Sequence, residues 1–229
     1  MKAFLLAAVA WLVAIPAAAQ VVGHSPATSP YSDLEHSQEL TLEFGYTRTR
    51  HDPAGVAPKS APLLGLRYEL SIVGPLALSS EITRTFSDRD VLDPSKPRAT
   101  RSVGTESAPV YSADLALALN LTGRKSWHLL VPQVRAGLGV VSSPAKDATS
   151  GYSFGTPFAF TFGGGVKVVP GGRFQLRGDL TDRVFKLSYP DAYYRLASDN
   201  TAVLDVSTPR SPYTHHLGMT LGVSYLFGR

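Results

Sequence analysis

The sequence predicts an all-β protein: an eight-stranded antiparallel up-and-down transmembrane β-barrel, apolar on its outside and polar on its inside. Three observations predict this fold. Alternating apolar and polar positions recur in eight runs after residue 37, which is the period of a β-strand. The connections between the runs are alternately short and long, as in barrels with turns on one side of a membrane and loops on the other. The N-terminus has the pattern of a secretory signal peptide.

The N-terminal pattern places the chain outside the inner membrane. Lys2 is followed by an apolar run and by an Ala-x-Ala cleavage pattern that ends at Ala19. The apolar run is well short of the ~20 residues that a membrane-spanning helix needs. We therefore expect three parts: a signal peptide (1–19), a periplasmic N-terminal segment (20–37) and an outer-membrane β-barrel (38–229).

The composition excludes several kinds of site. The chain contains no cysteine, so it has neither disulfides nor thiolate metal sites. A net charge of +4 is too small to indicate a nucleic-acid partner. The six histidines are scattered along the sequence, and we expect no metal site and no cofactor. They are His24, His36, His51, His128, His215 and His216.

The first four runs each carry their apolar side chains on one face, because successive side chains of a strand point to opposite sides. These apolar residues are Leu40, Leu42, Phe44 and Tyr46, then Leu64, Leu66, Tyr68, Leu70 and Ile72, then Leu76, Leu78 and Ile82, then Tyr111, Ala113, Leu115, Leu117, Leu119 and Leu121. The fourth run excludes a helix, because its leucines recur at a spacing of two rather than three and four.

The last four runs repeat the pattern. Their apolar residues are Leu130, Val134, Ala136, Leu138 and Val140, then Phe158, Phe160, Phe162, Val166 and Val168, then Phe174, Leu176 and Leu180, then Leu217, Met219, Leu221, Val223, Tyr225 and Phe227. Pro132 cannot donate a ladder hydrogen bond, so we place it near a strand start or at a bulge. The triplet Gly163–Gly165 predicts a sharp bend or a close backbone approach.

The connections alternate in length along the chain. The short ones are Gly74-Pro75, Thr122–Trp127 and Pro170–Arg173. The long ones are about 49–61, 87–109, 142–156 and 187–211. The second long connection carries four charges of each sign, and we expect a solvated loop there.

Charge decides which face of the strands lies inside, since periodicity alone also fits a soluble sandwich or a lipocalin. The polar faces carry full charges of both signs near mid-strand, which suits an interior where charges must pair. A lipocalin interior holds apolar ligands, so a charged face argues against that fold. We predict an interior polar network of Glu43, Arg67, Glu69, Glu81, Asp114, Arg135, Lys167, Arg177 and Asp179.

Aromatic residues near the strand ends predict two interfacial girdles. We expect one girdle near the long loops, from Tyr46, Phe86, Tyr111, Phe158, Phe185 and Tyr213, and one near the short turns, from Trp127, Phe174, Tyr225 and Phe227. Arg84 and Asp182 fall on the apolar faces of their strands. An arginine at mid-bilayer costs about 2 to 4 kcal/mol, so both should lie above the apolar band, where Arg84 could meet lipopolysaccharide phosphates.

The last strand resembles the terminal assembly signal of bacterial outer-membrane proteins, through Thr220, Gly222, Tyr225 and Phe227. The chain after residue 37 as a whole resembles the small OmpA- and OmpX-like barrels of the outer-membrane β-barrel domain family. This resemblance implies a Gram-negative bacterial cell outer membrane and insertion by the barrel-assembly machinery. It also implies contact with outer-membrane lipid and lipopolysaccharide, and both chain termini in the periplasm.

The scaffold predicts no wide pore, because eight strands enclose a space that their own side chains fill. Activity would then come from the loops, through an extracellular ligand that the sequence does not identify. Clustered tyrosines beside an arginine could form a surface-binding loop: Tyr189, Tyr193, Tyr194 and Arg195. The alternative is a loop that extends strands seven and eight, with the rings packed on it.

Catalysis is not predicted. His215 and His216 are the most suggestive pair, but neighbouring strand residues point to opposite faces, so at most one looks inward. No serine, histidine and carboxylate constellation accompanies them. We expect an integral outer-membrane protein with a structural or surface-interaction role, and not an enzyme. A weak small-solute pore and a lipid A-modifying hydrolase are the alternatives.

Overall fold

The computed structural model describes residues 29–50, 52–144 and 150–228. The predicted signal peptide and residues 20–28 lie outside the described residues. Every described strand lies within Tyr31–Arg229. No helix in the described part of the chain is both long and apolar enough to cross a membrane.

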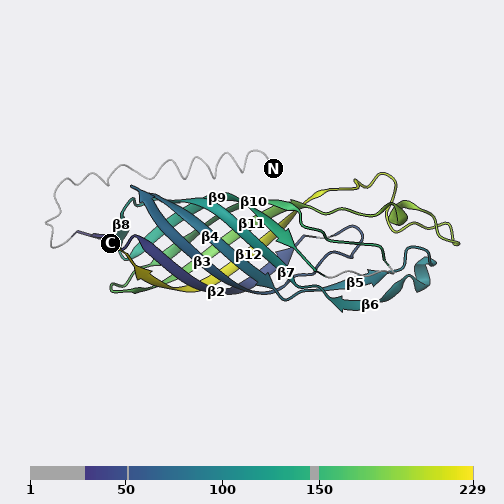
Figure 1. Cartoon of the computed structure of the whole chain (residues 1–229), viewed down its shortest axis with the longest axis horizontal. Helices are drawn as coiled ribbons and strands as arrows, with labels where there is room; N and C mark the ends of the chain where they lie inside the picture. The colour runs from purple at the N-terminus through teal and green to yellow at the C-terminus, as the bar shows by residue number, and fades with distance from the viewer. Residues whose placement is uncertain (1–28, 51, 145–149, 229) are drawn as a thin grey trace, which may run out of the picture. The chain divides into compact units, whose positions relative to one another are not determined.

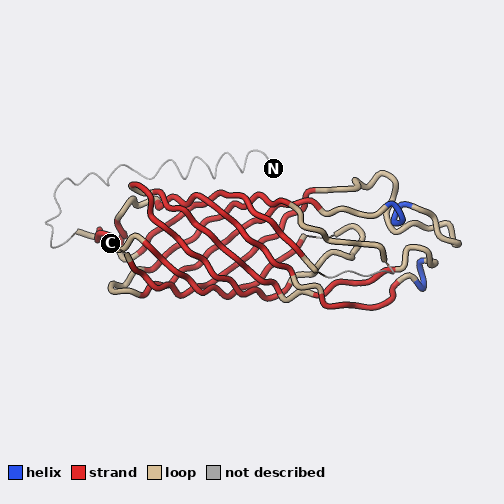
Figure 2. The backbone as a smooth tube through the Cα atoms, viewed as in Figure 1, coloured by secondary structure: helices blue, strands red, loops and turns tan. Residues whose placement is uncertain are grey.

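Eight strands close into a single antiparallel barrel (Figures 1 and 2). In order around the barrel they are β2 (Gln38–Thr49), β3 (Ala61–Val73), β4 (Leu76–Thr85), β7 (Val110–Asn120), β9 (Leu130–Ser142), β10 (Phe158–Val168), β11 (Phe174–Lys186) and β12 (Tyr213–Phe227). The last strand pairs with the first from His216↔Thr49 to Phe227↔Gln38. Closure leaves no sheet edge, and the predicted fold class is confirmed.

The connections alternate as predicted, with short turns at one end of the barrel and long loops at the other (Figure 2). The turn between β7 and β9 contains a short strand, β8 (Lys125–Trp127). A 3₁₀ turn, η3 (Asp191–Tyr194), lies in the fourth long loop.

The second long loop differs from the solvated loop that we expected. It folds back as a hairpin of β5 (Asp88–Leu92) and β6 (Ser102–Ser107), with a 3₁₀ turn, η2 (Arg98–Thr100), between the strands. The hairpin buries Arg89 and Val91 from β5. The sequence pattern did not predict this strand, because one of its two buried side chains is charged and the buried face is therefore not apolar.

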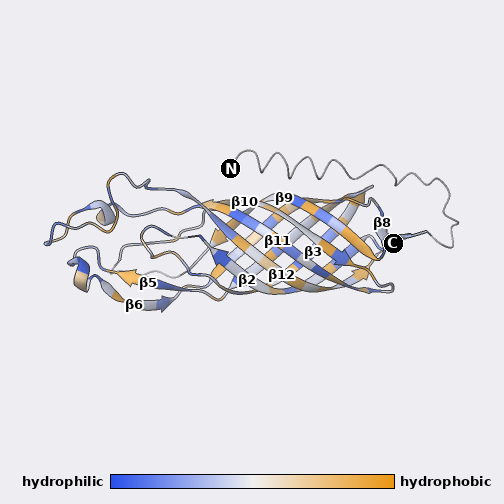
Figure 3. Ribbon diagram, turned by 180° about the vertical axis from the view of Figure 1, so that it is seen from behind, coloured by the Kyte–Doolittle hydropathy of each residue, from blue (hydrophilic) through white to orange (hydrophobic). Residues whose placement is uncertain are grey.

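Side chains alternate between the two surfaces of the barrel along every strand. Leu221 on the outside is 73% exposed, whereas Glu43 and Arg67 on the inside are fully buried. Coloured by hydropathy, the strands show hydrophilic and hydrophobic residues in alternation (Figure 3). The barrel is therefore apolar outside and polar inside, the reverse of a soluble barrel.

Two backbone predictions can be compared with the strand register. Pro132 is the third residue of β9, near the strand start. The glycine triplet marks a close approach and not a bend, because β10 pairs without a break on both sides. A Cβ atom on Gly165 would lie 2.3 Å from Asp179 Oδ1, and one on Gly163 would lie 2.6 Å from the Leu180 carbonyl oxygen.

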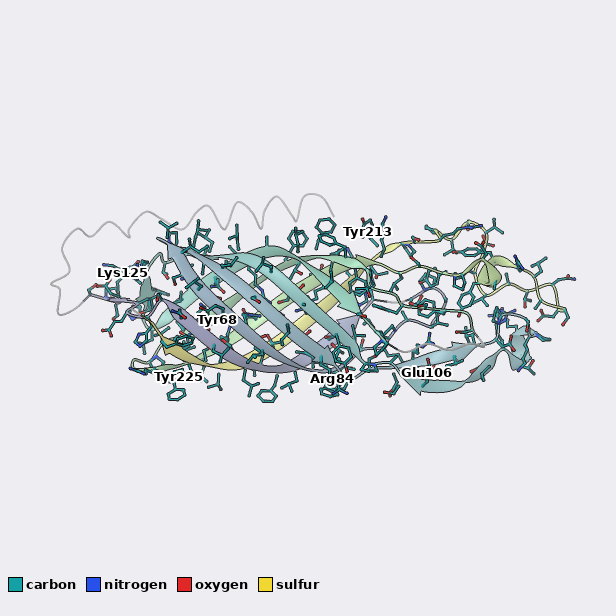
Figure 4. All side chains as sticks on the ribbon, viewed as in Figure 1. Tyr68, Arg84, Glu106, Lys125, Tyr213 and Tyr225 are labelled. Atoms are coloured by element: carbon teal, nitrogen blue, oxygen red, sulfur yellow. The ribbon has the colours of Figure 1, made fainter. Side chains whose placement is uncertain are left out.

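The aromatic girdles form as predicted, with one exception. Tyr213 projects outward at the loop end and Tyr225 at the turn end (Figure 4). Phe185 was wrongly assigned to the loop-end girdle: it is 3% exposed and stacks on the His216 ring, with the ring centroids 4.0 Å apart. The reason is parity, since Phe185 lies on the same face of β11 as the inward-facing Arg183.

Candidate functional site

The centre of the barrel is built around Arg67. Its Nη2 lies 2.6 Å from Glu81 Oε2, its Nε lies 3.0 Å from Glu43 Oε1, and its Nη1 lies 3.2 Å from Asp179 Oδ2. All four side chains are buried. Glu81 on β4 is the register partner of Arg67, and Glu43 lies two residues along β2 from the other partner, Thr41. Asp179 projects inward from β11, three strands away around the barrel. Arg67 therefore joins two sides of the barrel.

Two further arginines extend this cluster towards the loop end. Arg135 Nη1 donates a hydrogen bond to Glu81 Oε2 at 2.6 Å. Arg183 donates from Nη2 to Glu81 Oε1 at 2.5 Å and from Nε to Asp114 Oδ2 at 2.8 Å. The Thr161 hydroxyl donates to the other Asp114 oxygen at 2.7 Å. Glu81 thus accepts hydrogen bonds from three arginines, which compensates the cost of burying its charge.

A second cluster fills the turn end of the interior. Lys167 Nζ lies 2.8 Å from Glu39 Oε2 and also donates to Glu69. Arg177 donates from Nη1 to Glu39 Oε1 at 2.9 Å and from Nε to Asp179 Oδ2 at 2.8 Å. Because Asp179 also contacts Arg67, the two clusters form one continuous network through the barrel.

All nine residues of the predicted interior network are buried inside the barrel. Two members are missing from the predicted set, Glu39 and Arg183. Both have the parity of the polar face of their strand. Glu39 was left out because it lies at the start of its strand and only charges near mid-strand were chosen, and Arg183 was left out because its run was ended two residues early. With these two, the described interior holds six carboxylates and five basic side chains: Glu39, Glu43, Glu69, Glu81, Asp114 and Asp179, with Arg67, Arg135, Lys167, Arg177 and Arg183.

Two separate cavities remain at the ends of the interior. A cavity of about 260 Å³ at the turn end is lined by Glu39, Glu69 and Lys167 among others. A smaller one of about 40 Å³ lies at the loop end, between Arg183 and Phe154. The charge network lies between them. The described residues therefore show no open path through the barrel.

A strap of chain crosses the turn-end opening. Strand β1 (Tyr31–Asp33) pairs antiparallel with β8, although β2, which follows it in sequence, lies between β3 and β12. The strap is held by Leu34 N–H, which donates to Arg124 O at 2.9 Å, and by Ser37 N–H, which donates to Gly228 O at 3.2 Å. Residues 31–37 are thus an ordered part of the turn end.

The long loops form a packed cap with its own hydrophobic core. Side chains from the first, third and fourth loops meet residues from the ends of β9, β10 and β11. Arg89 of the second loop lies over the Tyr152 ring, 5.2 Å from its centroid. The buried core residues are Ala54, Val56, Ala57, Val141, Tyr152, Phe154, Ala159, Phe185, Leu187, Tyr189, Tyr193 and Leu204.

The predicted tyrosine surface is divided by this core. Tyr189 and Tyr193 are buried in the cap, whereas Tyr194 is half-buried and Arg195 is exposed. The Tyr189 hydroxyl donates to Asp52, whose carboxylate also accepts from the backbone N–H of Val56 at 2.6 Å. Burial raises the pKa of the Tyr189 phenol, and this hydrogen bond raises it further. A binding surface here would rest on Tyr194 and Arg195.

The second and fourth loops are tied together. Arg101 donates from Nη1 to Ala202 O at 2.9 Å and from Nη2 to Thr201 O at 2.8 Å. The Asp199 carboxylate accepts from Arg98 N–H at 2.7 Å. The Arg98 N–H and the Thr201 hydroxyl hold the pKa of Asp199 below its usual value. These contacts position the two loop tips against each other.

The two charges predicted on the outer face lie there near the loop end. Arg84 is exposed, and its guanidinium lies 4.8 Å from the Phe86 ring centroid and 5.6 Å from that of Tyr111 (Figure 4). Asp182 Oδ2 lies 2.6 Å from Nδ1 of His215. Both sites are close to the last residues of their strands, where the apolar band ends.

The adjacent histidines point to opposite faces. His215 faces outward to Asp182, while His216 is buried inside and hydrogen-bonds the Thr214 hydroxyl at 2.9 Å. In the part of the chain that the structure describes, the Asp182–His215 pair has no hydrogen bond to a serine or cysteine. Within the described residues no group of three His, Cys, Asp or Glu side chains has metal-binding geometry.

The predicted assembly signal lies in β12. Tyr225 and Phe227 form an aromatic cluster at the turn end with Phe174 and Tyr68, with ring centroids 5.5 to 6.3 Å apart. Gly222 faces inward, where a Cβ atom would lie 2.7 Å from Thr41 Cγ2. Thr220 lies on the same face, paired with Gly45 of β2. Recognition of these four residues by an assembly machinery stays a prediction.

No protein-family model matches the sequence, and no curated protein is significantly similar to it. The crystal structure of Neisserial surface protein A matches with a TM-score of 0.52 and 12% sequence identity, over 83% of this chain and 97% of that one. The fold is that of a small outer-membrane β-barrel. OprG from Pseudomonas aeruginosa matches this barrel with a TM-score of 0.48 and 12% identity, over 85% and 98% of the two chains. The crystal structure of Ail of Yersinia pestis matches with a TM-score of 0.40 and 13% sequence identity, over 84% of this chain and 99% of that one.

Proposed function

We propose that this protein is an integral protein of a bacterial outer membrane, in which a sealed barrel holds an ordered cap of loops at the cell surface for interaction with an extracellular ligand. Its role in this proposal is non-catalytic. The observation that carries it is the reversed barrel: a paired charge network inside and an apolar belt outside. This arrangement is stable only where lipid surrounds the belt.

Interior packing favours an anchor over a pore. A solute would have to pass Arg67, Glu81 and Arg177, which bridge the walls of the barrel through ion pairs. Moving any of them leaves a buried charge without its partner, which is expensive. Single-channel recordings of the purified barrel in planar bilayers should therefore show no steady conductance.

The loop cap supports a role in interaction. Its core fixes the loops, so a ligand would meet a surface that is already ordered and costs less entropy to bind. The fourth loop also exposes two large apolar side chains, Leu196 and Val206, which are 67% and 84% exposed. Exposed apolar side chains next to an arginine and a half-buried tyrosine are typical of a protein-binding surface.

Orientation in the membrane is part of the proposal. The long loops face the exterior and the short turns face the periplasm, with insertion by the barrel-assembly machinery and lipopolysaccharide around the loop end. The signal-peptide pattern and the terminal strand pattern support this, as does the strap at the turn end, which tethers residues 31–37 beside β8.

Cysteine labelling tests the location and the orientation together, because the native chain contains no cysteine. Val206→Cys in the fourth loop and Lys125→Cys in the β7–β9 turn are matched exposed positions. A membrane-impermeant maleimide should label Val206→Cys on intact cells and Lys125→Cys only after the outer membrane is permeabilised. Equal labelling of both positions, or a freely soluble protein in the periplasmic fraction, would overturn the proposal.

A further inference from the structure

An apolar groove runs along the outer face of the barrel below Arg84. It has a volume of about 530 Å³ and its walls are outward-facing side chains of β2, β3, β4 and β9. Ala113 on β7 forms its floor, because this short side chain lies in register between Ile82 and Val140. The larger neighbours stand above the alanine and shape the groove.

Arg84 closes the groove at the loop end. Arg84 follows Ile82 by two residues on the outer face of β4. Its register partners on the neighbouring strands are Leu64 of β3 and Tyr111 of β7. The guanidinium is held by cation–π contacts with two aromatic rings. It has no carboxylate partner in the described part of the chain, in contrast to Asp182, which pairs with His215.

A second hollow on the outer face of the barrel serves as a comparison for the groove below Arg84. It has a volume of about 660 Å³ and lies over β2, β10, β11 and β12, where Gly164 and Gly178 lack side chains. The described residues that line it include no cation. The combination of an apolar groove and an unpaired cation at the aqueous end therefore belongs to the Arg84 site.

We propose that this groove holds one acyl chain of lipid A, with a lipid A phosphate bound by Arg84. A guanidinium offers several donors in a plane that matches phosphate oxygens, and the aromatic rings hold it in place at the level of the interface. The outward leucines and Ile82 provide the apolar contact for the chain. The choice of lipid A rests on the proposed orientation, which places this end of the strands in the outer leaflet.

The shape of the groove separates this site from general attraction of lipid to a basic rim. Arg48 is also exposed near the loop end of its strand, on β2, but does not line the groove. Ala136 is an exposed outward alanine on β9 that lines neither hollow. Arg48 and Ala136 supply matched control positions for Arg84 and Ala113.

Native mass spectrometry of the refolded barrel tests the proposal. The probes are bis-phosphorylated lipid A, phosphatidylglycerol and phosphatidylethanolamine, each added to the barrel in detergent. The native sequence should retain one lipid A in preference to both phospholipids. Arg84→Gln should lower this retention about tenfold, the value of one charged hydrogen bond, and Ala113→Leu should lower it by filling the groove.

The controls decide the outcome. Arg48→Gln and Ala136→Leu should retain lipid A as the native sequence does. Equal losses in Arg84→Gln and Arg48→Gln, no loss in Ala113→Leu, or equal retention of phosphatidylglycerol would each overturn the lipid A site. The heat-dependent shift in gel mobility shows beforehand that each variant has folded. Because this assay uses purified barrel, a negative result leaves the location measured by cysteine labelling intact.

Discussion

Arg67 and Glu81 face each other across β3 and β4 inside the barrel, with Nη2 of the arginine 2.6 Å from Oε2 of the glutamate. Neither side chain is more than 4% exposed. The same guanidinium contacts carboxylates of β2 and β11, so one arginine compensates three buried negative charges. This relationship makes the barrel interior both closed and dependent on each of its members.

Replacing Arg67 with leucine should destabilise the barrel strongly. Glu43, Glu81 and Asp179 would lose a shared cation in a site without bulk water, and breaking a buried ion pair costs about 3 to 5 kcal/mol. The measurement is the temperature at which the folded, fast-migrating form is lost on a gel. Arg84→Leu is the control, because that arginine has no ion pair inside the barrel. An unchanged heat shift in Arg67→Leu would contradict the polar-inside assignment.

The absence of a side chain at Gly137 should be required for the close pairing of β9 with β7. A Cβ atom there would lie 2.3 Å from the Leu115 carbonyl oxygen, and the rigid β7 backbone cannot move away. Gly137→Ala should therefore cost about 1 to 3 kcal/mol in urea unfolding of the barrel. Gly178→Ala, whose Cβ would meet a leucine methyl at 3.4 Å and the Thr220 carbonyl oxygen at 4.0 Å, should unfold close to the native midpoint. Similar midpoints for both variants would refute the packing argument.

Truncating Phe154 should loosen the cap and leave the barrel intact. Phe154 is 7% exposed and packs against Phe185, with ring centroids 5.7 Å apart. Removing a buried aromatic ring costs about 3 to 5 kcal/mol, and here this loss falls on the loops. Phe154→Ala should show faster proteolysis of the long loops with an unchanged heat shift. Val206→Ala, at an exposed loop position, is the control. If its loops were cut as fast as those of Phe154→Ala, the cap core would not be what protects the loops.

Acid should separate the tips of the second and fourth loops. The pKa of Asp199 is lowered by hydrogen bonds from the Arg98 N–H and the Thr201 hydroxyl. A lowered pKa means that the contact stabilises the loops above the ordinary value of 3.8 and is lost as the pH falls through the lowered value. The Arg98 amide proton, followed by NMR, should titrate below pH 3.8 in the native chain and stay constant in Asp199→Asn. Titration at or above the ordinary value would show that the contact is absent in solution.

The strand predictions succeeded because each rests on a local rule. In β7, five apolar residues at a spacing of two define one face, and no other part of the chain is needed to interpret them. The same rule assigned Arg67 and Lys167 to the inside. It failed for Phe185, where residue type was given more weight than parity, and for Arg183, where the run was ended two residues early.

The loop cap shows where sequence reasoning stops. Tyr189 and Tyr193 lie within five residues of Tyr194 in the sequence, yet they are buried with residues from the first and third loops. Nothing local distinguishes a buried tyrosine from an exposed one in an irregular segment. The β5–β6 hairpin was missed for a related reason, because its buried face includes Arg89 and so lacks an apolar repeat.

The sequence by itself determined the strands, their two faces and the assignment of the polar face to the inside of the barrel. Alternate side chains of a strand lie on opposite faces, and this stays true when the sheet closes. Only the tertiary structure decided which charges pair, since partners such as Arg67 and Asp179 are brought together by closure of the barrel and are distant in sequence. The cap and the groove below Arg84 likewise depend on the packing of several segments. Pairing and packing are set by distances between separate segments, which no local pattern records.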